Sequence, residues 1–488
     1  MKALACVTVI AAAASVGLAG VNDPWLTTDK SVDTRSAQTI VAGLVRPEMT
    51  DEQKVLTLFN WLRRAVYHSG PEEPLRHDFN LMVSVFGYGS CYMQTHPLSH
   101  LLHQCGYPTR NWIHNTHHML EVYYGGAWHC MDPHMTFYAY NRATPPVLAS
   151  VAELRADEAI AAKAVEEKRA CPGFLLCGDK PTWFSGDDKW TLDHPFLPHV
   201  GADQEFGGMR LPRGAKFVRT WKEGAFLASH AFGKGVGPYH TCGAGADRKD
   251  PINWPFWEPY VEKGHGRHHG TGYLEYQPDL GGGGWADGAL RHINLASRKG
   301  GGPALGPVAA DIEAEVIFHV DLPYVVTAAS LAFDAAKADE KSEIAVSAST
   351  KWAGQNRVWK TVEGDWSGAA KADLTPLVEG SVGGYWLRIT MKSSQPAKTG
   401  ISNLKLRTDF QLNPYALPYL VVGSNKIRAT AARADGPWNL RIAWSEGENW
   451  QKSREHKARI EGTVYEAMID AAGPKLPRME AIEISVEP

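Results

Sequence analysis

The chain has 488 residues, which is long enough for about two to four domains. Hydrophobic residues make up 44% of it and charged residues 21%, and these proportions are typical of a soluble globular protein rather than a disordered one. The formal net charge of −3 offers no electrostatic attraction to nucleic acid or to an anionic membrane, so we expect neither as a partner.

The N-terminus has the layout of a secretory signal peptide. Lys2 precedes an apolar run over residues 3–18, and small residues favour cleavage near Ala19 or Gly20. This run is shorter than the about 20 residues that a membrane-spanning helix needs, and no later stretch is apolar enough to span a bilayer. We therefore expect residues 1–20 to be removed and the mature protein to be secreted, into a periplasm or the extracellular space.

Export would place the remaining cysteines in an oxidising compartment, where some of them should pair. Cys171 and Cys177 are close in sequence and are the expected couple. The others are Cys91, Cys105, Cys130 and Cys242. Because the number left after cleavage is even, a reduced thiol at Cys91 would leave at least one further cysteine unpaired.

The first predicted elements after the signal are helices. Thr50 and Gln53 form a capping-box pattern, and the helix that they open has an apolar stripe on one face and ends near residues 68–71. A second helical pattern begins at Cys91 and ends before Gly106. This second helix places a cysteine at its first position.

Two strand-like runs follow, over residues 117–123 and 128–132, and they flank Gly125 and Gly126. Two such runs around a Gly-Gly pair are a strong signal of a β-hairpin. Residues 150–170 are polar and rich in alanine, and they predict a surface helix that completes the first domain.

From about residue 201 the pattern changes to short apolar runs between clusters of Gly, Pro and Asp. Strands are expected in the segments 217–221, 273–276 and 312–320. Residues 311–410 alternate between apolar and polar side chains, as in a β-sandwich. The Gly-rich segment 281–306 is expected to be a loop or linker.

Cys91 has the sequence context of a thiol nucleophile. At the start of a helix, unpaired backbone N–H groups and the positive end of the helix dipole favour a thiolate, and they can hold the oxyanion of an attacked carbonyl. Such a thiol also needs a base, and His117, His118 and Asp132 follow it in the sequence. A single cysteine at a helix start is more often structural, so the hypothesis depends on these residue types occurring in this order.

The hairpin distinguishes His117 from His118. With a two-residue turn, His117 faces His134, and Asp132 is its diagonal neighbour on the same side of the sheet. His118 then points to the other side. A loop of odd length would reverse this choice, because a slip of one residue turns every side chain to the opposite face. The even loop predicts His117 as the base and Asp132 as the residue that orients it.

These residues and their neighbours resemble the core of the transglutaminase-like superfamily, in its secreted bacterial type. The pattern consists of a nucleophile helix, a Gly-x-Pro-x-Arg step, a His four residues before Glu-Val, a glycine turn, a Trp and an Asp-Pro. It is formed here by Cys91, Gly106–Arg110, His117, Glu121-Val122, Gly125-Gly126, Trp128 and Asp132-Pro133. The resemblance covers residues 50–140 and implies a papain-like α+β fold with a Cys91–His117–Asp132 triad.

Two neighbours of the triad depart from the family pattern. Met119 stands where the family usually has an aromatic residue, and Tyr92 stands where it often has Trp. Because these positions shape the acyl pocket, the substrate is less well determined than the triad. We expect no cofactor, since the sequence has no signature of the calcium site that some relatives use.

Other candidate sites have simpler interpretations. The histidines at 265, 268 and 269 are a candidate zinc cluster, but the flanking glycines indicate an exposed loop, and we predict no metal site there. Tryptophans in the second half resemble the sugar-stacking platforms of carbohydrate-binding modules, but we favour core positions for them. They are Trp352, Trp359, Trp366 and Trp386.

The prediction is therefore a secreted enzyme with a transglutaminase-like α+β domain followed by all-β domains of the β-sandwich type. Its expected parts are the signal peptide (1–20), the catalytic domain (21–200), a β-rich region with the Gly-rich linker (201–310), a β-sandwich (311–410) and a C-terminal β-rich region (411–488). Cys91 would attack an amide of a protein or peptide-like substrate, and hydrolysis or acyl transfer would resolve the acyl-thioester. The alternative is a catalytically silent cell-surface binding or scaffold protein whose β-sandwich domains hold glycan or protein.

Overall fold

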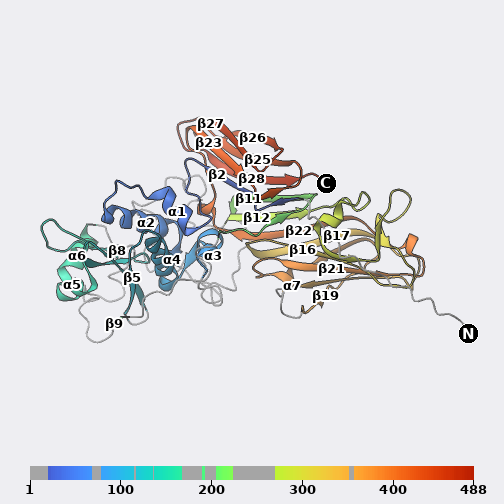
Figure 1. The fold of residues 1–488 in the computed structure, drawn as a ribbon, viewed down its shortest axis with the longest axis horizontal. Coiled ribbons are helices and arrows are strands. Elements are labelled where there is room, and N and C mark those ends of the chain that lie inside the picture. The colour runs from blue at the N-terminus through green and yellow to red at the C-terminus, as the bar shows by residue number, and fades with distance from the viewer. Residues whose placement is uncertain are drawn as a thin grey trace, which may run out of the picture.

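The computed structural model describes residues 20–68, 78–114, 117–135, 137–167, 190–192, 205–223, 270–350 and 357–488. β-Strands predominate over helices, and a large β-rich region includes the C-terminus, as predicted. Most of the helices gather at one end of the molecule, around a smaller sheet (Figure 1). None of the helices in these ranges is both long and apolar enough to cross a membrane.

The helices near the N-terminus begin where local sequence signals place them. In α2 (Asp51–Ala65), the predicted capping box is present: the Gln53 N–H donates to Thr50 Oγ1, and the Thr50 N–H donates to Gln53 Oε1. α4 (Cys91–Gln104) starts at the predicted cysteine. The other elements of this part before the sheet are α1 (Ala37–Leu44), β3 (Tyr67–His68), α3 (Phe79–Leu81), the π-helical turn η1 (Met82–Phe86) and β4 (Tyr88–Gly89).

A five-stranded antiparallel sheet, in the order β8-β7-β6-β5-β9, lies beside these helices. Alternate residues of β6 enter two hydrophobic clusters: Leu120 and Val122 join the large core that includes α4, while Met119 joins a smaller cluster with α5 and α6. The sheet therefore has helices on both faces. Its strands are β5 (Thr109–His114), β6 (His117–Tyr124), β7 (Ala127–Asp132), β8 (Phe137–Tyr138) and β9 (Trp190–Leu192).

The predicted surface helix at 150–170 is instead two helices. Asp157 separates α5 (Val151–Ala156) from α6 (Glu158–Glu166), and its carboxylate accepts a hydrogen bond from the Ala159 N–H as the cap of α6. Leu154 and Ile160 are buried in the smaller cluster. α5 and α6 together cover one face of the sheet, because both helices, before and after Asp157, contribute apolar residues to this cluster.

The β-rich region is built on two larger sheets that pack face to face (Figure 1). The first is ten-stranded and runs β14-β15-β22-β12-β11-β28-β25-β26, with β17 pairing to β22 and β20 to β17. The second runs β13-β16-β21-β18-β19. The Tyr385 and Thr408 hydroxyls, 2.7 Å apart, join β21 to β22 across the interface.

The strands predicted at 217–221 and 273–276 are confirmed within β11 (Ala215–Glu223) and β12 (Gly270–Tyr276). The strand predicted at 312–320 is confirmed as β16 (Ala314–Val320), which begins two residues later than predicted. The other strands of the two sheets are β13 (Ala289–Ile293), β14 (Leu295–Ser297), β15 (Leu305–Pro307), β17 (Val325–Ala336), β18 (Glu343–Ser349), β19 (Lys360–Thr361), β20 (Gly368–Asp373), β21 (Tyr385–Lys392), β22 (Gly400–Leu412), β25 (Trp438–Glu446), β26 (Lys452–Ile460) and β28 (Arg478–Val486).

Two smaller sheets tie the start of the described chain to its C-terminal part. β1 (Val21–Asn22) pairs with β10 (Arg210–Leu211) and β24 (Arg433–Ala434). β2 (Trp25–Thr28) pairs with β23 (Gly423–Thr430), which also pairs with β27 (Val464–Ala471). Short helices complete the region: η4 (Gly284–Gly288), α7 (Thr375–Val378), η5 (Pro396–Lys398) and η6 (Pro414–Ala416).

In the second half of the chain, strands from different predicted domains pair with one another. The ten-stranded sheet takes strands from all three segments 201–310, 311–410 and 411–488, so these segments do not form separate sheets. The Gly-rich segment 281–306 is not a simple loop or linker either, since it contains η4, β13, β14 and the start of β15. Its glycines allow tight turns between short strands. Of these strands, β14 and β15 pair with each other, β13 pairs with β16, and β15 also pairs with β22.

The tryptophans of the sandwich are mainly core residues, as expected. Trp366 and Trp386 are buried, and Trp386 stacks on His319. Trp359 is half-buried beneath the guanidinium of Arg388, whose carbon lies 4.6 Å from the ring centroid. Trp352 lies outside the described residues.

Asn413, at the end of β22, joins the β-rich region to the helices around α4. Its backbone N–H donates to the carbonyl of Ser84 at 3.0 Å. Its side-chain Nδ2 donates to the carbonyls of Ala65 and Val83, at 3.0 and 2.6 Å. Asn413 is only 2% exposed, so bulk water cannot readily replace it as the hydrogen-bond donor to these carbonyls.

We expect Asn413→Ala to lower the free energy of unfolding by about 1–3 kcal/mol, because it leaves buried carbonyls without their donor. Urea unfolding followed by tryptophan fluorescence measures this loss. The matched control is Asn439→Ala, which removes an exposed 3.4 Å bond to Glu487 and should change stability by less than about 0.5 kcal/mol. Equal effects of the two substitutions would contradict the role of Asn413 as a buried link.

Candidate functional site

The β6–β7 hairpin has the predicted register. Gly125 and Gly126 both have positive φ, 58° and 85°, as a two-residue type I′ turn requires. Tyr124 pairs with Ala127, and the pairing continues to Leu120 opposite Met131. Two glycines at the turn therefore fix which side chains of β6 and β7 share a face.

His117 and Asp132 lie on the same side of this hairpin and are hydrogen-bonded. Their Nε2 and Oδ2 atoms are 2.6 Å apart. Asp132 is fully buried, and its Oδ1 accepts a second hydrogen bond from the Met135 N–H at 3.0 Å. The turn after β7 thus holds the carboxylate in the orientation that the imidazole requires.

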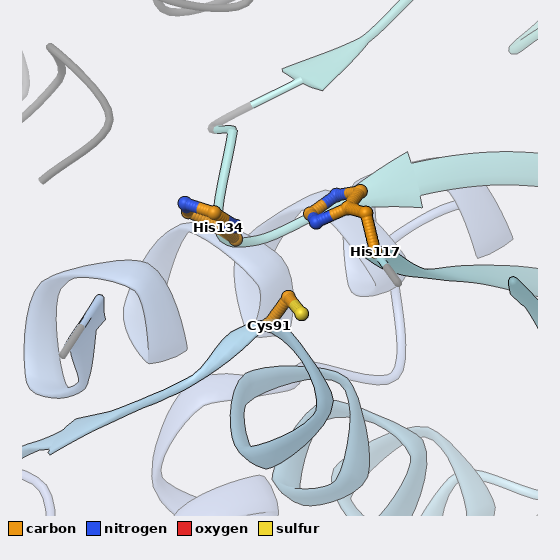
Figure 2. A group of neighbouring side chains, drawn as sticks. All are labelled: Cys91, His117 and His134. Atoms are coloured by element: carbon orange, nitrogen blue, oxygen red, sulfur yellow. The ribbon is translucent and has the colours of Figure 1, made fainter. Parts of the chain in front are cut away.

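Cys91 lies below the His117 ring at the amino end of α4 (Figure 2). Ser90, the cap residue, makes no side-chain capping hydrogen bond, so no hydroxyl competes for the first N–H groups of the helix. The Cys91 Sγ and one ring nitrogen each of His117 and His134 all lie within 4.8 Å of one another. Together with the His117–Asp132 hydrogen bond, this places the three residues predicted from the sequence, Cys91, His117 and Asp132, beside one another and adds His134 to them.

The charge state of His117 is set by its neighbours. Burial disfavours the charged ring, but the Asp132 carboxylate and its hydrogen bond outweigh burial, and together with Cys91 they raise the pKa of His117 to about 10. An imidazolium is therefore the stable form at neutral pH. A positive ring beside Sγ stabilises negative charge on the sulfur.

His118 has different partners. Its Nδ1 lies 2.9 Å from Asn111 Nδ2, and its ring makes an edge contact with Tyr92 at a centroid distance of 4.8 Å. This arrangement agrees with the expected opposite orientation of the two neighbouring histidines.

Glu121 is a supporting residue that the sequence marked only as part of a motif. Its buried carboxylate accepts hydrogen bonds from Arg110 Nε at 2.6 Å, from the Val151 N–H at 2.8 Å and from the indole of Trp112. The Arg110 guanidinium also covers the Trp128 ring, with 4.1 Å between its carbon and the ring centroid. One carboxylate thus fastens β5 and the start of α5 to β6.

His134 is the member of the cluster that lies outside the predicted triad. The sequence predicts that it faces His117 across the hairpin, as a structural or subsite-lining residue, and the two ring centroids are 5.0 Å apart. It is buried, and it brings a second imidazole close to Cys91 (Figure 2). The register alone was the signal that placed it there.

The remaining cysteines fall into two groups. Cys130 is buried as expected, and burial raises the pKa of its thiol well above the usual value. Cys105 is half-buried, and burial raises its pKa as well. The predicted Cys171–Cys177 pair, Cys242, the histidines at 265–269 and the signal peptide up to Ala19 lie outside the described residues.

Comparison of the sequence with models of known protein families finds no match, and no curated protein matches the chain either.

The buried Glu121–Arg110 pair gives a stability prediction. Glu121→Ala should lower the free energy of unfolding by about 3–5 kcal/mol, because it leaves an indole, a backbone N–H and a guanidinium without their acceptor. Chemical denaturation checks it. As a control, Glu455→Ala removes an exposed partner of Arg441 and should have little measurable effect, since surface ion pairs contribute little. A small effect at Glu121 would show that water replaces the carboxylate.

The raised pKa of His117 predicts a pH dependence of stability. A histidine in the unfolded chain titrates near 6.5, whereas folded His117 titrates near 10. The contribution of the charged ring is therefore complete below about pH 6.5 and is lost as the pH rises to about 10. The stability advantage of the wild type over His117→Gln should shrink over this interval in urea unfolding experiments. A constant difference between the two proteins would show that His117 is uncharged.

Proposed function

We propose that this protein is a transglutaminase-like cysteine enzyme that acts on amide bonds through an acyl-thioester at Cys91. The observation that carries the proposal is the alignment of Cys91, His117 and Asp132, with the 2.6 Å Nε2–Oδ2 bond orienting the imidazole toward the sulfur. A nucleophile, a base and an orienting carboxylate in this order are what thiol catalysis needs.

A papain-like N-terminal domain is part of the proposal. Two features support it: α4 presents the cysteine at its amino end, and an antiparallel sheet presents the histidine and the aspartate from adjacent strands. The resemblance to the transglutaminase-like core also accounts for Arg110, Glu121 and Trp128, which form one contact network beside the triad. An exported, soluble location, based on the predicted signal peptide, belongs to the same proposal.

The reaction follows from the positions of the three side chains. The Cys91 thiolate attacks the amide carbonyl carbon, and the first N–H groups of α4 stabilise the oxyanion. Protonated His117 gives its proton to the leaving amine, which leaves an acyl-thioester. Neutral His117 then takes a proton from water or from an acceptor amine as that molecule attacks the thioester. Collapse of the second intermediate releases the acid or the new amide together with the Cys91 thiolate.

The test uses the full chain and a glutamine-containing peptide with a fluorescent primary amine. Attachment of the amine to the peptide indicates acyl transfer. Release of ammonia from the peptide without attachment of the amine indicates hydrolysis. Cys91→Ala should remove turnover, and His117→Ala and Asp132→Asn should each lower kcat by about 10²–10⁴-fold. His118→Ala is the matched control and should have a much smaller effect.

The alternative, a catalytically silent binding or scaffold protein, predicts a different result. Amide-directed thiol probes would then fail to label Cys91 in folded protein, and Cys91→Ala would change none of the measured properties. Either outcome is read by mass spectrometry of the intact chain, with circular dichroism to show that each variant is folded.

A further inference from the structure

The cluster around Cys91 contains one side chain that the proposed acyl transfer does not use. His134 is buried, and it places a ring nitrogen within 4.8 Å of both the Cys91 sulfur and a nitrogen of His117 (Figure 2). We propose that Cys91, His117 and His134 form a reversible zinc site, and that bound zinc blocks the thiol. This inference goes beyond the proposed function and does not require that acyl transfer occurs.

The three donors are the types that zinc prefers. Zinc binds a thiolate at about 2.3 Å and imidazole nitrogens at about 2.0–2.1 Å, which separates the donor atoms of a tetrahedral site by about 3.3–3.6 Å. Because the donor atoms now lie within 4.8 Å of one another, they need to approach by at most about 1.2–1.5 Å, which is within reach of small side-chain rotations. Three protein ligands also leave a fourth position for water, as in zinc sites with an open coordination position.

Asp132 provides a second feature, independent of the donor distances, that supports a zinc site. Zinc-binding histidines usually donate their other ring N–H to a carboxylate, which fixes the tautomer and the ring orientation. The Nε2 of His117 already has such a carboxylate partner, Asp132 Oδ2 at 2.6 Å, so a metal would bind His117 through Nδ1. The hydrogen bond from the Met135 N–H holds Asp132 in place. The supporting interactions of a metal ligand are thus present without any rearrangement of the strands.

Zinc and substrate would exclude each other, because they use the same atoms. The thiolate sulfur that attacks a carbonyl is also the atom that binds the metal, and donation to zinc lowers its nucleophilicity. The imidazole nitrogen that transfers a proton must lose that proton before it ligates zinc, so binding releases protons to solvent. Zinc would therefore hold the enzyme in an inactive form from which a chelator restores the thiol.

The experiment starts from full-length protein freed of metal with a chelator. Zinc chloride is titrated against a chromophoric chelator, and alkylation of Cys91 by iodoacetamide is followed by mass spectrometry with and without zinc. We expect one zinc ion per chain at this site and alkylation slowed by about tenfold or more at saturation, reversed by a chelator. Cobalt in place of zinc should give a thiolate-to-metal charge-transfer band that Cys91→Ala removes.

Variants identify the ligands. Cys91→Ala and His134→Ala should each lose this zinc ion, and Asp132→Asn should weaken binding by about 10–100-fold. His292→Ala, at an exposed position of β13, is the matched control and should bind zinc as the wild type does. Zinc bound with unchanged affinity in both Cys91→Ala and His134→Ala would assign the metal to other residues and overturn the proposal.

The two proposals fail separately. If zinc binds and protects Cys91 but no amide is ever turned over, the acyl-transfer function is wrong and the zinc site stands. If amide turnover is intact and saturating zinc leaves both turnover and alkylation unchanged, the zinc site is wrong and the enzyme stands. Circular dichroism of each variant excludes loss of fold as the cause of lost binding.

Discussion

The two-glycine turn at Gly125 and Gly126 is the constraint on which the candidate site depends. Because side chains alternate along a strand, an even loop places His117 and Asp132 on one face and sends His118 to the other. One inserted residue would replace the His117–Asp132 bond with a different pair. Both glycines have positive φ, a conformation that most other residues adopt only at a cost in free energy. The chemistry of the site is therefore set by the backbone of a turn that has no catalytic atom of its own.

Buried carboxylates keep this geometry rigid. Asp132 is held by a backbone N–H and bonds to His117, while Glu121, two pairs along the same face of the hairpin, joins β5, β6 and α5. Each carboxylate is removed from water, and each has several donors, which is the condition under which a buried charge is tolerated. Asp132 determines the charge of the imidazole and Glu121 fixes the strand that carries it. We therefore expect the removal of Asp132 to affect the imidazole and the removal of Glu121 to affect the stability of the sheet.

Features encoded by neighbouring residues could be predicted from the sequence, and features encoded by distant pairing could not. The capping box at Thr50, the helix start at Cys91 and the register of β6 and β7 each depend on residues a few positions apart, and all three are present. The break at Asp157 was missed because the alanine-rich composition on both sides favours helix. The sheet order was missed for a different reason. β22 pairs with β12, β15 and β17, and no local pattern specifies which of many similar strands become neighbours.

Asn413 connects this long-range pairing to the thiol. It lies at the end of β22 and donates to carbonyls of Ala65, Val83 and Ser84, the last two in the turn that leads to Cys91. Gly87 lies against it: a Cβ there would come within 2.6 Å of the Asn413 side chain, so this contact and the positive φ of 63° both favour glycine. The position of Cys91 therefore depends on a strand more than 300 residues later in the chain. A β-rich region attached in this way supports the segment that leads to Cys91, and this support gives it a structural role even if its surface binds no glycan or protein.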